Sequence, residues 1–162
     1  MYMRTLSCLI VRQPYASLIA FGKKRWEFRS YPTKKEGIIG IASSPSEKLR
    51  TLDPELNRVS GLFPRGVVLA TANLVTSFYV TASDLESKKT NPIPVKLHRA
   101  IVHTCDEPLG EPIIDVDNAI KNKGWESFAW LLEDVRVLED PVPFNRTASR
   151  STWVAVDINE GT

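Results

Sequence analysis

The segment Arg12–Arg29 constrains the fold more than any other part of the chain, because it contains signals for a helix start, a helix end and a strand. Pro14 suits the first turn of a helix, where a backbone N–H is not needed, and Gly22 suits the left-handed turn that ends one. We therefore expect a helix over 13–21. Over 25–31 large apolar and charged residues alternate, which predicts a strand with two chemically different faces.

This alternation assigns Trp26 and Phe28 to a buried face, and Glu27 and Arg29 to a face that is more accessible or lines a cleft. Lys24 precedes the strand and can lean toward the second face. A lysine, a carboxylate and a guanidinium beside a tight turn would form a small polar pocket with several donors and one acceptor. A solvated surface pair of little energetic weight fits the same residues. The residues alone leave both interpretations open.

Several short motifs, in this order along the chain, resemble the signature of ASCH domains, the activating signal cointegrator homology family. They are Gln13-Pro14-Tyr15-Ala16, Gly22-x-Lys24-x-x-Glu27-x-Arg29, the runs 37–43 and 130–135, Pro141-Val142-Pro143 and Trp153-Val154. The resemblance spans almost the whole chain and is weakest over 56–120. Where the family often has a glycine-rich turn before the final tryptophan, this chain has the basic run 145–150.

Short strands dominate the rest of the pattern. We expect strands over 4–11, 37–43, 66–79, 98–105, 129–138 and 151–158, with helical pieces within 46–59, near Leu85 and over 118–123. The absence of a regular βαβ alternation predicts an α+β chain, a small mixed β-barrel with short flanking helices. The resemblance implies that this barrel is of the type named after pseudouridine synthase and archaeosine transglycosylase (PUA-like). The length of 162 residues predicts a single domain over 1–162.

Composition excludes several classes of protein. The hydrophobic share of 43% and the charged share of 25% are typical of a globular chain. No run approaches the roughly 18 apolar residues of a membrane span, and the first residues lack a signal-peptide cleavage site, so we expect a cytoplasmic protein without membrane contact. Cys8 and Cys105 are expected as free thiols. His98 and His103 lack the spacing of a metal site, so neither a metal nor another cofactor is expected.

For function, the resemblance implies a cleft that accepts RNA or a modified nucleobase. The net charge of +2 is only weakly basic, but local clusters of cations could gather on one face. In such a cleft Arg12 and Gln13 would donate to base edges, and Tyr15 and Trp153 would stack on bases, although both also suit a core. The cations expected to meet phosphate or a base carbonyl are Lys24, Arg29 and Arg150.

A metal-independent hydrolase is the alternative. The family includes ribonucleases and amidohydrolases of N4-acetylcytidine, the latter using a lysine, a nearby threonine and a later glutamate. Lys24 matches that lysine, Glu27 stands where the threonine would be, and Glu86 is the nearest candidate for the later glutamate, without a secure match. Glu27 could act as general base on water while Lys24 and Arg29 stabilise an oxyanion. The sequence leaves open whether the chain is an enzyme and whether it has a protein partner.

Overall fold

The structure, a computed structural model, describes residues 2–46, 62–81, 126–145 and 151–160. Its elements in chain order are β1 (Tyr2–Val11), α1 (Tyr15–Ala20), β2 (Trp26–Arg29), β3 (Gly37–Ser43), β4 (Val67–Thr81), β5 (Glu126–Pro143) and β6 (Trp153–Glu160). The expected helices within 46–59, near Leu85 and over 118–123 lie outside the described residues, and so does the expected strand over 98–105. The strand expected over 37–43 has the predicted bounds.

The described strands form a mixed, open sheet in the order β2-β5-β4-β3-β1-β6. β1 runs parallel to β3 and antiparallel to β6, and β2 runs antiparallel to β5. Within the described residues the two end strands, β2 and β6, each pair on one side only. The expectation of a closed barrel is therefore wrong for this part of the chain, since closure requires both edge strands to find a second partner. The described part of the chain is mostly β, with one short helix.

Contacts divide the chain into two compact units, and β4 and β5 each contribute to both. Unit 1 comprises Met1–Gly22, Gly37–Asn73 and Asp134–Thr162, and unit 2 comprises Lys23–Glu36 and Leu74–Glu133. The prediction of a single domain over 1–162 stays a prediction.

Unit 1 is centred on β1, whose residues become buried from Leu6 onward. One core cluster consists of buried side chains from β1, β3, β4 and β6: Leu6, Cys8, Ile10, Ala42, Val68, Val156 and Ile158. Gly40 lies opposite Cys8 in the parallel ladder between β1 and β3, and a Cβ atom there would collide with the Cys8 sulfur. Glycine is therefore required for this close approach of the two strands.

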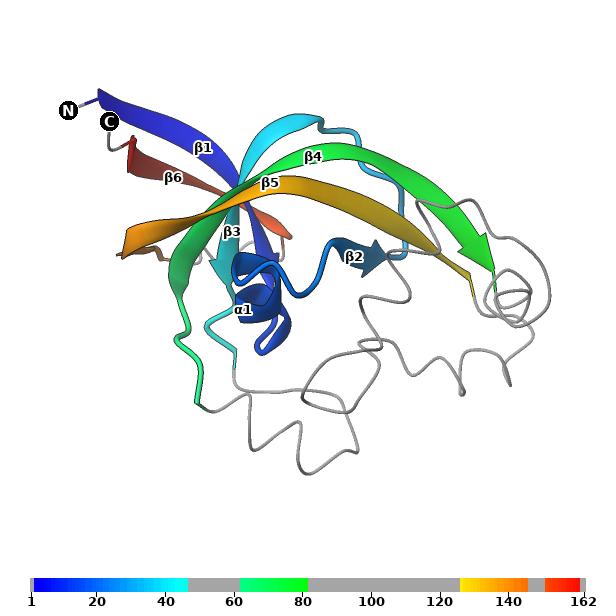
Figure 1. The fold of residues 1–162 in the computed structure, drawn as a ribbon, viewed down its shortest axis with the longest axis horizontal. Coiled ribbons are helices and arrows are strands. Elements are labelled where there is room, and N and C mark those ends of the chain that lie inside the picture. The colour runs from blue at the N-terminus through cyan, green and yellow to red at the C-terminus, as the bar shows by residue number, and fades with distance from the viewer. Residues whose placement is uncertain (1, 47–61, 82–125, 146–150, 161–162) are drawn as a thin grey trace. The chain divides into compact units, whose positions relative to one another are not determined.

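Helix α1 follows β1 directly and packs against β1 and β3 (Figure 1). It is shorter than the predicted helix over 13–21, and every residue from Ala16 to Ala20 is buried. The helix therefore has no fully exposed face. Gly22 has a φ of 73°, so the predicted left-handed turn after the helix is confirmed.

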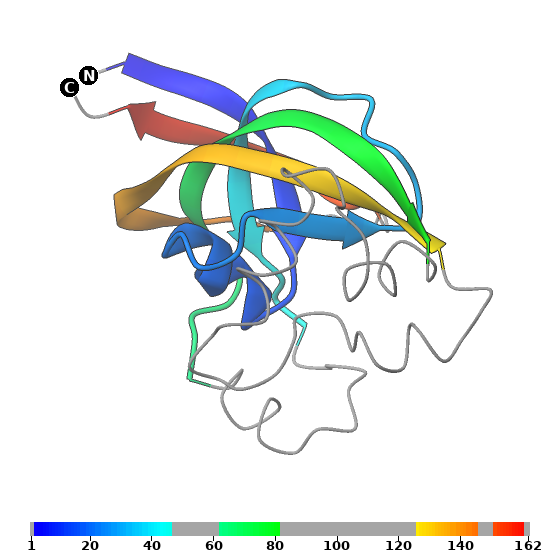
Figure 2. The ribbon, with the colours of Figure 1, turned by 45° about the vertical axis from the view of Figure 1, so that its right-hand side comes forward.

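Unit 2 is built on the pairing of β2 with β5, which Figure 2 shows running side by side. Trp26 and Trp130 are almost completely buried, each at 1% exposure. Trp26 contacts the ring of Phe78 on β4 at a centroid distance of 5.7 Å. These contacts fix β2 and the turn before it, which carries Lys24. In the described part of the chain, no helix has the length and apolar character needed to cross a membrane.

Candidate functional site

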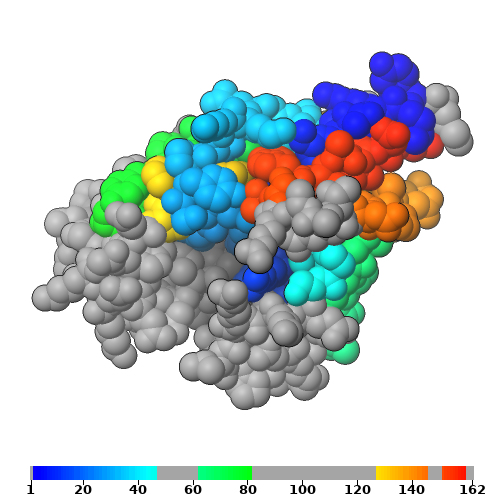
Figure 3. Space-filling view, turned by 180° about the vertical axis from the view of Figure 1, so that it is seen from behind, coloured from blue at the N-terminus to red at the C-terminus, as the bar shows by residue number. Residues whose placement is uncertain are grey.

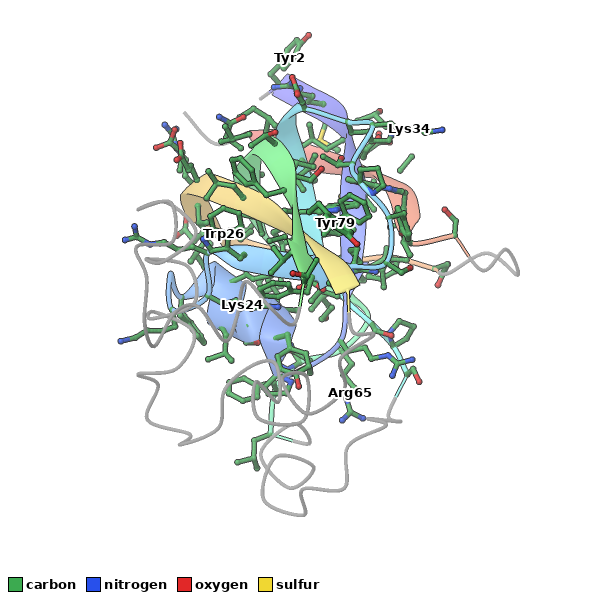
Figure 4. The ribbon with its side chains drawn as sticks, turned by 90° about the vertical axis from the view of Figure 1, so that its right-hand side faces the viewer. Tyr2, Lys24, Trp26, Lys34, Arg65 and Tyr79 are labelled. Atoms are coloured by element: carbon green, nitrogen blue, oxygen red, sulfur yellow. The ribbon has the colours of Figure 1, made fainter. Side chains whose placement is uncertain are left out.

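Lys24, Glu27 and Arg29 form an ion-pair cluster in unit 2, and we call these three residues the charge cluster. The Lys24 Nζ atom lies 2.6 Å from Oε2 of Glu27 and donates a hydrogen bond to it. The Nε atom of Arg29 lies 3.3 Å from the other carboxylate oxygen, Oε1. Lys24 therefore leans toward the strand face of Glu27 and Arg29, as expected, and the two oxygens of one carboxylate face two different cations. Figure 4 shows Lys24 at the turn before the β2 residue Trp26.

Burial distinguishes this cluster from a surface ion pair. The side chains of Lys24, Glu27 and Arg29 are 3%, 10% and 16% exposed. Glu27 is not accessible: its side chain is buried beside Trp130, which stands opposite it in the ladder between β2 and β5. The alternative, that Glu27 lines a cleft, stays a prediction. Phe28, expected to be buried, is only half-buried. Water is therefore largely excluded from the carboxylate, and each charge depends on its partners.

The charges in this cluster perturb one another's protonation. Burial lowers the pKa of Lys24, while the carboxylate of Glu27 opposes that shift. For Glu27, burial alone would raise the pKa, but the positive charges of Lys24 and then Arg29 outweigh it and lower the pKa below its ordinary value. Glu27 is therefore an ionised acceptor at neutral pH, and Lys24 releases its proton more readily than an exposed lysine. With all three groups charged, the cluster carries one net positive charge.

Aromatic rings lie on the same sheet face as the carboxylate and the guanidinium. Because directly opposed residues of an antiparallel pair share a face, Trp130 accompanies Glu27 and Phe128 accompanies Arg29. The Phe128 ring contacts Tyr79 of β4 at 5.4 Å between centroids. The Trp130 ring contacts Tyr31 at 5.6 Å, and its Nε1–H donates to the Tyr31 carbonyl at 3.0 Å. We did not predict these rings as site residues. The adjacent aromatics Phe78 and Tyr79, at the end of the strand expected over 66–79, were a usable signal.

The other predicted site residues belong to unit 1 or lie outside the described residues. Arg12 is exposed, whereas Tyr15 and Trp153 are half-buried. Arg150 lies outside the described residues. The structure therefore brings together Lys24, Glu27 and Arg29, and the contribution of the remaining residues to a common site stays a prediction.

Gln13 is engaged in structural hydrogen bonds. Its side chain is buried, and its Nε2 donates to the Ser17 hydroxyl at 2.9 Å and to the Pro64 carbonyl at 2.7 Å. Its Oε1 accepts from the Ser17 backbone N–H at 3.0 Å. The amide thus holds the first turn of α1 to the segment at Pro64. Its predicted role in contacting base edges would require these bonds to be exchanged.

Metal-binding residues do not cluster in the described residues, where no group of three His, Cys, Asp or Glu side chains could hold an ion. His98 and His103, whose spacing is not that of a metal site, lie outside the described residues. Cys8 is a free, buried thiol whose pKa is raised to about 11 by burial, so it is protonated at neutral pH. The donors of the charge cluster instead suit an anion or a polarised carbonyl.

Comparisons with known proteins found similar solved structures and a matching family model. Among solved structures, the chain is similar to an ASCH protein from Zymomonas mobilis, at 15% identity and a TM-score of 0.48 over 95% of this chain and 87% of that chain. A tyrosine-to-phenylalanine mutant of that protein matches at 16% identity and a TM-score of 0.48, over 95% of this chain and 90% of that chain. A serine-to-alanine mutant matches at 17% and 0.45, over 85% of this chain and 72% of that chain.

A search among curated proteins found no match. The family model described as the ASCH domain matches residues 9–141, which include the charge cluster and most of the chain. The chain therefore belongs to the ASCH domain family.

Proposed function

We propose that this chain binds RNA or a modified nucleobase through a surface centred on the charge cluster. The observation that carries the proposal is a largely buried carboxylate held between two cations, which leaves one net positive charge beside aromatic rings. RNA-binding surfaces combine such features, because cations meet phosphates or base carbonyls and rings stack on unpaired bases. Membership of the ASCH family supports this class of ligand.

Within this surface we assign Arg29 the direct contact to the ligand. It is the most exposed member of the charge cluster, and its Nε atom lies 3.3 Å from Glu27, so the ion pair favours one orientation of the planar guanidinium. An oriented guanidinium loses little freedom when it binds a phosphate or a carbonyl. Lys24 neutralises the second carboxylate oxygen and supplies the cluster's excess positive charge. Contacts of Arg12, Gln13, Tyr15, Arg150 and Trp153 with RNA or a nucleobase stay predictions.

Fluorescence anisotropy with a labelled single-stranded RNA of about 12 nucleotides tests the proposal, since single-strand binding sites span roughly 4–16 nucleotides. Arg29→Gln should weaken binding to all sequences alike and reduce the slope of log affinity against log salt by about one. Arg136→Gln, at an exposed position of β5, removes the same formal charge and serves as the matched control. Equal effects of the two substitutions would reduce the interaction to general electrostatics and contradict a site at Arg29.

A metal-independent hydrolase is the second candidate. It is favoured by the 2.6 Å contact between Lys24 and Glu27, which places an ammonium group beside an ionised carboxylate. In an acylated nucleoside such as N4-acetylcytidine, a water molecule at the exposed tenth of the Glu27 side chain would give its proton to Glu27 as the water oxygen bonds to the acyl carbon. Lys24 and Arg29 would stabilise the oxyanion. Collapse of that intermediate breaks the C–N bond and returns the proton to the leaving amine, giving acetate and cytidine.

Chromatographic detection of cytidine from N4-acetylcytidine, without added metal, tests this second candidate. Glu27→Gln and Lys24→Met should each lower turnover by at least about 100-fold, because each removes a group that handles a proton or charge in the transition state. Turnover that persists in both variants would remove the pair from the mechanism. Absence of turnover by the unmodified protein, together with binding of RNA, would leave the binding function alone.

A further inference from the structure

Tyr79 is the most exposed aromatic side chain of unit 2 among the described residues, at 53% exposure. Its ring is supported by Phe128, and Phe128 lies opposite Arg29 in the ladder between β2 and β5. Residues from three adjacent strands therefore form a row across one sheet face, in the order Arg29, Phe128, Tyr79. We call it the aromatic row. Figure 4 labels Tyr79, which lies on β4.

The loop after β2 adds cations beside the exposed end of this row. The Thr33 backbone N–H donates to the Ser77 hydroxyl at 3.2 Å, which ties the loop to β4 two residues before Tyr79. Ser77 and Tyr79 alternate onto the same face. Lys34 and Lys35 are exposed on this loop, and Glu36 is its one acid, so the loop is net positive. Figure 3 shows the light-blue residues of this segment against the yellow and green strands of unit 2.

Aromatic residues also make up the exposed hydrophobic surface of unit 2. Its large exposed hydrophobic residues in the described chain are all aromatic: Tyr31, Phe78 and Tyr79. Tyr31 lies on the face of the aromatic row, through its contact with Trp130, whereas Phe78 packs against Trp26. Flat rings next to cations complement a polymer that alternates aromatic bases with phosphates. An acidic peptide would use the cations alone and leave the rings without a role.

We propose that Tyr79, supported by Phe128 and flanked by Arg29, is a stacking platform for one unpaired base of single-stranded RNA. The proposal rests on the RNA-binding function proposed above and adds the residue that receives a base. Stacking tolerates any base, because every base has a π-face, so the platform contributes affinity with little sequence preference. Lys34 projects away from the sheet (Figure 4) and can meet the phosphates that flank this base.

The test compares two labelled oligomers of about 12 nucleotides, one a single-stranded RNA of A and C, the other with abasic sites in place of every base. Tyr79→Ala should weaken binding of the first between about 5-fold and 100-fold, the range measured when a stacking ring is removed. It should leave binding of the abasic oligomer and the salt slope unchanged, because stacking neutralises no phosphate. Tyr79→Phe should retain the affinity of the parent. Tyr2→Ala, at a 72% exposed tyrosine of unit 1, is the matched control and should also bind like the parent.

Each outcome decides between the proposals. If Arg29→Gln weakens binding and Tyr79→Ala does not, the stacking platform is overturned while the RNA-binding surface stands. An equal loss for the base-containing and abasic oligomers would also overturn stacking, since it would show a role for Tyr79 that does not involve bases. If the unmodified protein binds neither oligomer, both proposals fail. Thermal unfolding of Tyr79→Ala at the parent's midpoint excludes loss of fold as the cause.

Discussion

Replacing Glu27 by glutamine should destabilise the protein more than any other single change in the charge cluster. Glu27 is the one carboxylate of the cluster and faces both cations, with its side chain 10% exposed. Glutamine has nearly the same shape but no charge, so Lys24 and Arg29 would remain close together without a counter-charge. Removing one partner of a buried ion pair lowers the free energy of unfolding by about 3–5 kcal/mol.

Lys24→Met provides the comparison. It removes one cation and leaves the Glu27 carboxylate paired with Arg29, so the cost should be smaller, about 1–3 kcal/mol. The double variant Lys24→Met/Glu27→Gln should cost less than the sum of the two single changes, because the two side chains contact each other directly. For a domain of this size, Glu27→Gln should lower the melting temperature by about 6–20 °C.

Urea unfolding followed by tryptophan fluorescence measures these differences, because Trp26 and Trp130 are buried beside the cluster. The linear extrapolation gives the free energy of unfolding for each variant. A Glu27→Gln protein within about 1 kcal/mol of the parent would refute the buried-pair account, since a solvated pair contributes no more than that. A larger loss for Lys24→Met than for Glu27→Gln would refute the central place of the carboxylate.

Three further predictions concern pH and packing. The folded-state pKa of Glu27 is lowered, so the ionised Glu27 side chain should contribute fully to stability above its ordinary pKa of 4.5. This contribution should disappear as the pH falls through the lowered pKa. Over that pH range Glu27→Gln should therefore lose less stability than the parent. Gly40→Ala should lower the free energy of unfolding by about 1–3 kcal/mol, because the added methyl group collides with the Cys8 sulfur, and Cys8→Ala should relieve part of this loss in a double variant. Gln13→Ala should lose about 1–3 kcal/mol in urea unfolding, since the bonds to Ser17 disappear, and stability equal to the parent's would show that those bonds are replaced by water.

The local elements were predictable from the sequence because their signals are local. The turn at Gly22, the strand over Gly37–Ser43 and the proximity of Lys24 and Glu27 all depend on residues close together in the chain. The helix after Pro14 was also predictable, though not its length. Five of its six residues are buried and Tyr15 is half-buried, so amphipathic spacing had no exposed face to reveal.

The pairing of distant strands was not predictable, and the errors at the site follow from that. Alternation over 25–31 indicated the two faces of β2 but not the strand that pairs with it. The burial of Glu27 depends on β5, about 100 residues later in the chain, where Trp130 stands opposite. The same pairing places Phe128 beside Arg29 and brings Tyr79 into the row. Whether a sheet closes likewise depends on which strands form its edges, and alternation carries no information about that.

A nitrogen–proton NMR titration with single-stranded RNA tests the central claim most directly, because it locates the binding surface without a substitution. The Arg29 Nε–H, held near Glu27 Oε1, is the decisive signal. Our account predicts that RNA shifts this signal together with the backbone amides of 24–35, Tyr79 and Phe128. Shifts confined to β1 and β6, with the Arg29 signal unchanged at saturating RNA, would contradict it.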